Sequence, residues 1–341
     1  MRPLLALALL LAACAAPSLP PPDPSDMPTT PHLTEDAIIA EDGARLPLRV
    51  WLPAGKVEAV VLAVHGFNDY SNAFTWPAEA WAEHGIATYA YDQRGFGAAP
   101  DRRFWLGTER LDMDLDLASR LLREKYPRQP LYLLGESMGA AVIMTAVTGA
   151  AGAPRPAADG LILVAPAVWG RATMNVFERV ALWAADTLVP GMTLTGRGLG
   201  IKPSDNTEML RALARDPLVI KATRVATIKG LVDLMGQAFA AAPRLDMPML
   251  LLYGEHDEII PAEPVRRMIE ALPPAPAEER RIAWYPQGWH MLLRDLDRAV
   301  VTGDIAHWIA DRAAPLPSGA DRRVSAFPAA SRQAPRRFTQ K

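Results

Sequence analysis

A serine between two glycines is the feature of this sequence with the clearest chemical potential. The segment Gly135-Glu136-Ser137-Met138-Gly139 joins the apolar run LYLLG to a helix-type segment rich in small residues. A sharp strand-to-helix turn needs residues without bulk around the serine, and it exposes the hydroxyl at a helix N-terminus, where developing negative charge is stabilised. The pattern therefore predicts a nucleophilic serine.

A serine hydroxyl becomes reactive only when a base removes its proton and an acid holds that base in the right tautomer. His290 follows the apolar run RIAWYP and begins a helix-type segment. Asp257 follows the run MLLLYG, in a turn where Glu255 and Glu258 are alternative acids. Because the carboxyl ends of parallel strands meet at one edge of a sheet, we expect Ser137, His290 and one of these carboxylates to form a catalytic triad.

The loop after the run AVVLAV is placed to bind the negative oxygen of an acyl-transfer intermediate. We expect its Phe67 N–H and the Met138 N–H, directly after the serine, to be the two donors. His65 is predicted to brace this loop rather than to catalyse. In the turn DQRGFG, Asp92 and Arg94 are predicted to be scaffold residues. This chemistry requires no metal and no cofactor.

The elements that position these residues follow from alternation of short apolar runs with longer helix-type segments, which predicts a mostly parallel sheet. We expect about eight strands, the first two forming a hairpin. Their residues are 37–40 and 46–52, followed by AVVLAVHG, ATYAY, LYLLG, LILVAP, MLLLYG and RIAWYP. Helices are predicted at residues 73–84, 109–126, 138–150, 264–272 and 292–313.

The interval from residue 168 to residue 245 is too long for a simple crossover between two strands. The runs MNVFERVALWAADTLV and MLRALARDPLV within it have helical spacing of apolar residues, which predicts a helical cap over the sheet. Large apolar residues of the first run are predicted either to line an acyl channel or to form the core of the cap. These residues are Phe177, Leu182, Trp183, Leu188 and Met192.

The first 16 residues, MRPLLALALLLAACAA, have a positive start, an apolar run and small residues, which is typical of a secretory signal and too short to span a membrane. The run LAAC resembles the lipobox of bacterial lipoproteins, in which the peptide is cut before the cysteine and the cysteine is lipidated. This resemblance implies a membrane anchor at Cys14, and Ala15 favours the outer membrane of the cell envelope. An ordinary signal peptide cut near Ala16 is the alternative.

Composition limits the other classes of function. The 341 residues carry a formal net charge of -2, which provides no basic field for nucleic acid. Cys14 is the only cysteine, which excludes an intramolecular disulfide and a cysteine nucleophile within the fold. The predicted division of the chain is: 1–13 signal peptide, 14–33 Pro-rich tether, 34–167 and 246–313 core, 168–245 cap insertion, and 314–341 disordered tail.

Five segments together resemble the monoacylglycerol lipase and lysophospholipase branch of the α/β-hydrolases, also called serine aminopeptidase-like: HGFNDYSNAF, DQRGFG, GESMG, DPLV and GEHDEIIP. The resemblance implies the α/β-hydrolase fold with a helical cap after the sixth strand. It also implies the triad Ser137, Asp257 and His290 and a serine hydrolase acting on monoacylglycerol, lysophospholipid or related acyl esters. A peptidase or amidase, and a catalytically silent lipoprotein that only binds ligands, are the alternatives.

Overall fold

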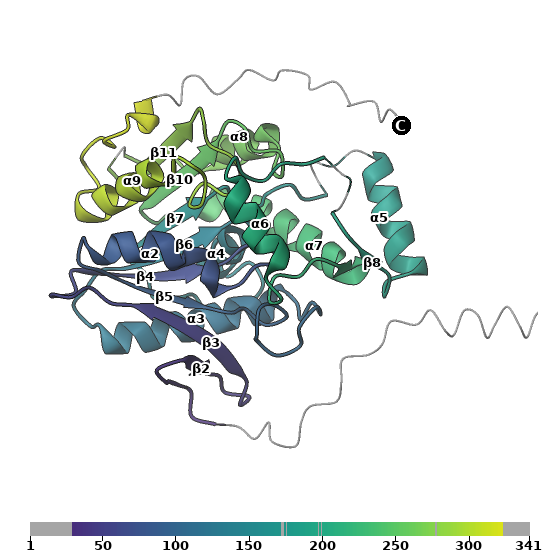
Figure 1. The fold of residues 1–341 in the computed structure, drawn as a ribbon, viewed down its shortest axis with the longest axis horizontal. Helices are drawn as coiled ribbons and strands as arrows, with labels where there is room; N and C mark the ends of the chain where they lie inside the picture. The colour runs from purple at the N-terminus through teal and green to yellow at the C-terminus, as the bar shows by residue number, and fades with distance from the viewer. Residues whose placement is uncertain are drawn as a thin grey trace, which may run out of the picture.

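The computed structural model describes residues 29–322, except residues 172, 173, 175, 197, 199 and 277. The predicted signal peptide, Cys14 and most of the tether lie outside the described residues, as does the chain from residue 323. The described part forms one large sheet with helices on both faces and a smaller group of elements beside it (Figure 1).

The central sheet has nine strands in the order β1-β2-β3-β5-β4-β6-β7-β10-β11. The first three strands are antiparallel, β3 pairs antiparallel with β5, and the others run parallel. Five inner strands are buried along their whole length, as expected for apolar runs in a sheet covered on both faces. The strands are β1 (His32–Leu33), β2 (Ala37–Ile39), β3 (Arg45–Trp51), β4 (Ala59–Val64), β5 (Ile86–Tyr91), β6 (Leu131–Glu136), β7 (Gly160–Val164), β10 (Met249–Gly254) and β11 (Arg280–Tyr285).

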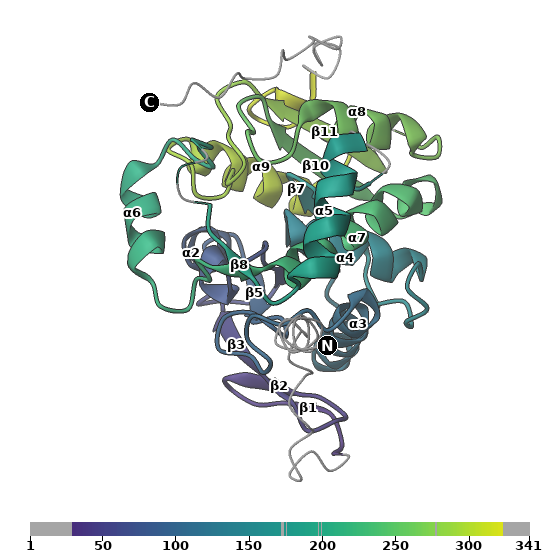
Figure 2. The ribbon, with the colours of Figure 1, turned by 90° about the vertical axis from the view of Figure 1, so that its right-hand side faces the viewer.

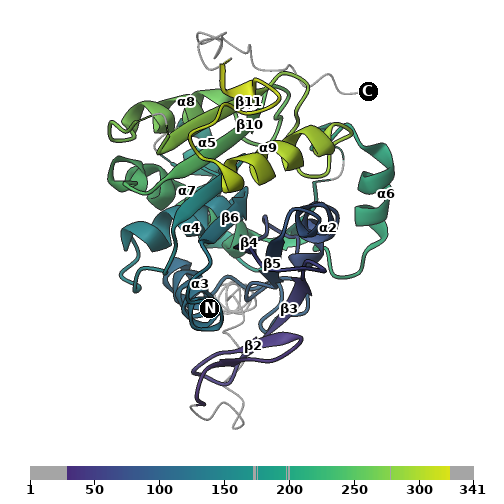
Figure 3. The same ribbon diagram turned by 90° about the vertical axis from the view of Figure 1, so that its left-hand side faces the viewer.

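Two helical layers cover the sheet (Figure 3). One layer contains η1 (Ser71–Phe74), α2 (Thr75–Ala82) and α9 (Arg298–Ala310), which bury Phe74, Trp81 and Trp308 against one face of the sheet. The other contains α3 (Thr108–Lys125), α4 (Met138–Thr148), α7 (Val225–Ala241), η2 (Ala242–Arg244) and α8 (Ala262–Ala271). This three-layer arrangement is the α/β architecture that the alternation of runs predicted.

The observed elements differ from the sequence prediction at two places in the core. A two-residue strand, β1, pairs with β2 at the edge of the sheet, so the sheet has one strand more than expected. Helix α9 begins at Arg298 rather than at Leu292. The preceding residues form turns instead, in which the Arg294 and Asp295 N–H groups both donate to the Met291 carbonyl.

The insertion between β7 and β10 contains α5 (Val176–Leu188), β8 (Thr193–Leu194), α6 (Thr207–Arg215), β9 (Thr223–Arg224) and α7. Strands β8 and β9 form a separate antiparallel pair. Helix α7 packs on α4 inside the core, so the predicted cap of residues 168–245 is too long at its C-terminal end. The segment Val225–Arg244 is apolar and long enough to cross a membrane, but half of it is buried in this fold, as expected for a core helix.

The chain from residue 314 to residue 322 is packed, which makes the predicted disordered tail wrong for these residues. Leu316 and Ala320 are buried against the helical layer of α9. The Ser318 hydroxyl donates a hydrogen bond to Asp304 of α9, and Asp321 forms an ion pair with Arg281 of β11. This segment forms no regular helix or strand and is held by contacts of individual side chains. Its sequence therefore shows no apolar periodicity.

Candidate active site

Ser137 lies in a backbone turn that the sequence around it makes possible. Its φ of 55° and ψ of -113° form a conformation that L-residues rarely adopt, between the end of β6 and the start of α4. A Cβ at Gly139 would lie 1.9 Å from the Val64 carbonyl oxygen, and one at Gly135 would lie 2.4 Å from the Ala140 nitrogen. Only glycine fits at either position, so the two glycines allow the tight turn that presents Ser137.

Asp257 and His290 are in direct contact. The Asp257 Oδ2 atom lies 2.7 Å from His290 Nδ1, and the other carboxylate oxygen of Asp257 accepts hydrogen bonds from the Ile259 and Ile260 N–H groups. The side chain of Asp257 is fully buried. The carboxylate is therefore fixed in place, and it orients the imidazole so that Nε2 is left to accept a proton.

The two alternative acids in the same turn are engaged elsewhere. Glu255 accepts a hydrogen bond from the indole N–H of Trp284, and Glu258 accepts one from the Lys202 N–H. Asp257 is therefore the carboxylate of this turn that pairs with His290.

The protonation of His290 depends on its charged neighbours. Burial alone lowers the pKa of His290, but the Asp257 carboxylate, the hydrogen bond with it and the Glu136 carboxylate outweigh burial and raise the pKa above its ordinary value of 6.5. A raised pKa favours the imidazolium that forms when a base takes a proton. It also means that the neutral base is lost as the pH falls through this raised value.

Ser137 and His290 line the same cavity, which has a volume of about 480 Å³ and lies at the carboxyl ends of the strands. Both side chains are mostly buried, with 9% and 6% of each residue exposed. Among the described residues, the Ser137 hydroxyl has no hydrogen bond to the imidazole. Catalytic hydrogen bonds are often long or poorly aligned without substrate and tighten only when it binds, so this geometry is compatible with the predicted role of Ser137 as nucleophile.

The two predicted oxyanion donors border Ser137. Phe67 lines the cavity, and its N–H donates to no acceptor within the described part of the chain. Met138 is the first residue of α4, where an N–H has no partner inside the helix. A Cβ at Gly66 would be 3.4 Å from the Ser137 Cβ, so the Phe67 loop approaches the serine closely.

His65, Asp92 and Arg94 have structural roles, as predicted. His65 is fully buried, and its two ring nitrogens bond to the Gly66 carbonyl and the Gln93 N–H. Burial lowers the pKa of His65, which keeps the ring neutral. Asp92 accepts the N–H groups of Ser71 and Ala98.

The walls of the cavity differ from the expectation for the cap. Phe177, Trp183, Leu188 and Met192 are 82%, 65%, 64% and 45% exposed, so they neither line a channel nor form a cap core. Leu182 is half-buried against the main core. The apolar walls instead come from residues whose cavity role the sequence reasoning missed: Trp169, Met174, Ile228, Leu231, Val232, Met235, Ile259 and Ile260.

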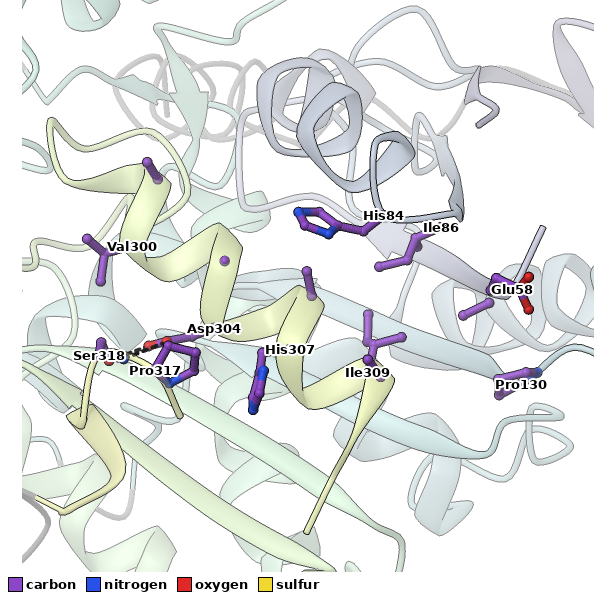
Figure 4. Close-up of a pocket in the computed structure, with 15 residues that line it drawn as sticks. Glu58, His84, Ile86, Pro130, Val300, Asp304, His307, Ile309, Pro317 and Ser318 are labelled. Atoms are coloured by element: carbon purple, nitrogen blue, oxygen red, sulfur yellow. Dashed lines mark hydrogen bonds between the residues drawn. The ribbon is translucent and has the colours of Figure 1, made fainter. Parts of the chain in front are cut away.

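A larger hollow of about 980 Å³ lies at the opposite edge of the sheet, where β4 and β5 begin (Figure 4). His84, His307 and Asp304 line it, but Asp304 is already bonded to Ser318 and Tyr285. Ligands of open α/β sheets bind at the carboxyl ends of the strands. The smaller cavity at Ser137 is therefore the candidate active site.

The strand order, the glycine-flanked serine turn and the Asp257–His290 contact define an α/β-hydrolase fold. The family model described as "Serine aminopeptidase, S33" (Hydrolase_4) matches residues 55–297, and the chain belongs to this family. It is a serine hydrolase.

Curated relatives and solved structures agree with this assignment. The chain is 25% identical to the monoglyceride lipase of Rattus norvegicus over 292 residues, which covers 83% of this chain and 91% of the relative. It is 24% identical to the monoacylglycerol lipase of Mycolicibacterium smegmatis, with coverage of 81% and 96%. A soluble variant of the monoglyceride lipase of Saccharomyces cerevisiae, in complex with a substrate analogue, has the same fold, with a TM-score of 0.67, 21% identity and coverage of 85% and 98%.

Proposed function

We propose that the protein hydrolyses carboxylic esters of single acyl chains through Ser137, His290 and Asp257. The observation that carries the proposal is the 2.7 Å contact between Asp257 and His290 on the cavity that also contains Ser137. A buried acid, an oriented imidazole and a serine presented by a tight turn are the parts that acyl transfer needs. The curated relatives named monoglyceride lipases support the choice of an ester.

The reaction has two stages. His290 Nε2 takes the hydroxyl proton as Ser137 attacks the ester carbonyl, and the Phe67 and Met138 N–H groups stabilise the oxyanion that forms. The imidazolium then gives its proton to the leaving alcohol, which leaves an acyl-serine. Water, deprotonated by the same imidazole, attacks the acyl-serine and releases the fatty acid and the free hydroxyl.

The chemistry of the cavity favours a neutral alcohol group, as in monoacylglycerol, over the phosphate of a lysophospholipid. Most of its wall is apolar and suits an acyl chain, while Asp69, Glu136 and Arg294 form its charged part. The single guanidinium is already paired with both carboxylates. An anionic phosphate would therefore meet no unpaired positive charge at this end of the cavity.

The triad assignment is tested by substitution and by labelling. Ser137→Ala and His290→Ala should each lower the turnover of p-nitrophenyl butyrate by about 10⁴ to 10⁶. Asp257→Asn should lower it by roughly 10⁴, because it stabilises the wrong tautomer of the imidazole. Glu255→Gln is the matched control from the same turn and should retain wild-type turnover. A Ser137→Ala protein with a tenth of wild-type turnover would contradict the assignment.

A substrate panel separates ester hydrolysis from the alternatives. Monoacylglycerols should be cleaved faster than lysophospholipids of the same chain length, and both faster than aminoacyl anilides. Rapid anilide cleavage with inert esters would identify a peptidase. No labelling of Ser137 by a fluorophosphonate probe in the folded protein would identify a binding protein without catalysis.

We also propose that Cys14 carries a lipid anchor that holds the enzyme to the bacterial cell envelope. The support is the LAAC run and the Pro-rich segment that follows it. Several acyl chains on one residue would anchor a protein stably. Cys14→Ser should release the protein from the membrane fraction and abolish incorporation of labelled palmitate, and unchanged membrane retention would reject the anchor.

A further inference from the structure

One buried arginine contacts two carboxylates beside the catalytic serine. Arg294 Nη1 lies 2.7 Å from Asp69 Oδ2, and Arg294 Nη2 lies 2.8 Å from Glu136 Oε2. Less than a tenth of each of the three residues is exposed, and all three line the cavity. We call these three residues the Arg294 cluster.

The cluster joins the three segments of the chain on which the proposed chemistry depends. Glu136 directly precedes the nucleophile Ser137. Asp69 follows the oxyanion donor Phe67 by two residues, and Arg294 follows the base His290 by four. Glu136 is the last residue of β6, and the segments of Asp69 and Arg294 follow β4 and β11 respectively. A single guanidinium therefore connects loops that are far apart in the sequence.

We propose that Arg294 is a positioning residue that holds the nucleophile loop, the oxyanion loop and the base loop in register for acyl transfer. The proposal rests on the function proposed above, because it assigns no chemistry of its own to Arg294. A shift of about 1 Å in one reacting group can cost a hundredfold in rate, so a rigid connection between the three loops has a direct catalytic value.

The chemistry of the cluster requires arginine at this position. A planar guanidinium offers several donors in a fixed fork and can contact two carboxylates at once, whereas a lysine ammonium acts as a point charge. Burial of such a group is costly, and buried ion pairs are weak evidence for stability. The cluster is therefore better explained by the geometry it imposes than by a gain in stability.

The structure contains a matched control for this cluster. Arg94 is also buried and contacts two carboxylates, Asp42 and Asp114. None of these three residues lines the catalytic cavity. Removal of Arg94 takes the ion-pair partner from the buried Asp114, while Asp42 keeps Arg110. Only removal of Arg294 releases the catalytic loops.

The cluster also acts on the charge of the base. Asp257 and Glu136 raise the pKa of His290, and Arg294 lowers it. Two further carboxylates lie close by: Asp69 binds Arg294, and Asp295 accepts the Trp289 N–H. Glu136→Gln removes one of the charges that raise the pKa of His290, and the glutamine carbonyl can still accept from Arg294.

The experiment measures kcat and kcat/KM for p-nitrophenyl butyrate between pH 5 and pH 9, with thermal unfolding followed by circular dichroism. Arg294→Met should lower kcat on the alkaline plateau about a hundredfold, while Arg294→Lys should restore part of it. Arg94→Met should lower the melting temperature and keep kcat within about threefold of wild type. In Glu136→Gln the acid limb of kcat/KM should move to lower pH, whereas Arg94→Met should leave it in place.

Two outcomes would overturn the proposal. One is a folded Arg294→Met protein whose plateau kcat is within about threefold of wild type. The other is a folded Arg94→Met protein that loses as much plateau kcat as Arg294→Met, because the loss would then not be specific to the catalytic loops. If Arg294→Met does not fold, Arg294→Lys and the isosteric Glu136→Gln decide the question. These outcomes can be distinguished from a failure of the proposed function. In that case the wild-type protein itself would neither cleave the ester nor be labelled at Ser137.

Discussion

Helices α5 and α7 lie in the same insertion and are both rich in large apolar residues, yet their surroundings are opposite. Eight residues of α7 are buried, and the helix packs on α4 and lines the catalytic cavity. No residue of α5 is buried, and the helix lies at the edge of the molecule, outside α7 (Figures 1 and 2). Apolar composition alone therefore does not indicate which helix of an insertion forms the site.

Small residues explain the difference. A Cβ at Gly230 of α7 would lie 2.3 Å from the Trp105 ring, and a Cβ at Gly170 would lie 2.4 Å from the Gly236 Cα atom of α7. These glycines let α7 approach its neighbours closely, which fixes the wall of the cavity. Helix α5 instead exposes Val176, Phe177 and Trp183. The two helices thus divide the insertion into a fixed wall and an outer apolar surface.

The largest effect expected from this difference is on stability. Leu234→Ala on α7 removes a fully buried side chain and should lower the free energy of unfolding by about 2 to 5 kcal/mol. Trp183→Ala on α5 removes a side chain that is 65% exposed and should change it by no more than about 0.5 kcal/mol. Urea denaturation measures both values. Equal losses for the two variants would show that α5 is packed in solution.

A smaller effect is expected on the choice of substrate. Met235→Ala removes part of the apolar cavity wall, and each methylene group of a substrate buried against that wall contributes about 0.8 kcal/mol. The kcat/KM for a dodecanoyl ester should therefore fall about five- to tenfold, while the value for a butyryl ester should stay within about twofold. Phe177→Ala on α5 is the control and should change neither value in detergent-free assays with monomeric substrate. If Phe177→Ala lowered kcat/KM for the dodecanoyl ester more than Met235→Ala did, the acyl chain would bind at α5 instead.

The smallest effect concerns a charged group in the helical layer that supports α7. Asp112 of α3 accepts a hydrogen bond from Thr145 of α4, and burial raises the pKa of Asp112 to about 8. The unfolded chain releases this proton near the ordinary pKa of 3.8. The folded state therefore loses stability progressively as the pH rises from about 4 to about 8, and the full loss is present above about 8.

Asp112→Asn should therefore raise the free energy of unfolding at pH 9 by at least about 1 kcal/mol more than at pH 5. Asp186→Asn on helix α5 is the control and should change the free energy of unfolding by no more than about 0.5 kcal/mol. Thermal unfolding at the two pH values measures the difference. A gain that is equal at both values would exclude titration of Asp112 as its cause.

Much of the core follows from the sequence because its strands are short apolar runs that can be buried only inside a covered sheet. The five inner strands lie where those runs predicted them. The proximity of the loops that carry Asp257 and His290 follows from the same logic, since both loops come after parallel strands. The choice of Asp257 over Glu255 and Glu258 came from the family resemblance. For these strands and loops, the local sequence pattern agrees with the overall fold.

The remaining features depend on contacts that no local pattern contains. Arg294 lies in the segment RDLD, which has the composition of a solvated helix face, and only the fold brings Asp69 and Glu136 to it. The position of α7 as a cavity wall depends on Gly230 and Gly236. Their small size matters only because the fold brings Trp105 and Gly170 into contact with them. The exposure of α5 likewise could not be predicted, because its apolar spacing does not show that no other element of the described fold packs over it.

The packed segment after α9 determines where the chain can be shortened. Ending the protein at residue 313 would remove Leu316 and Ala320 from the core and would leave Arg281 without its carboxylate partner. Ending it after Arg322 removes none of these contacts. Expression plasmids and crystallisation trials should therefore keep the nine residues from 314 to 322, although their composition resembles that of a dispensable linker.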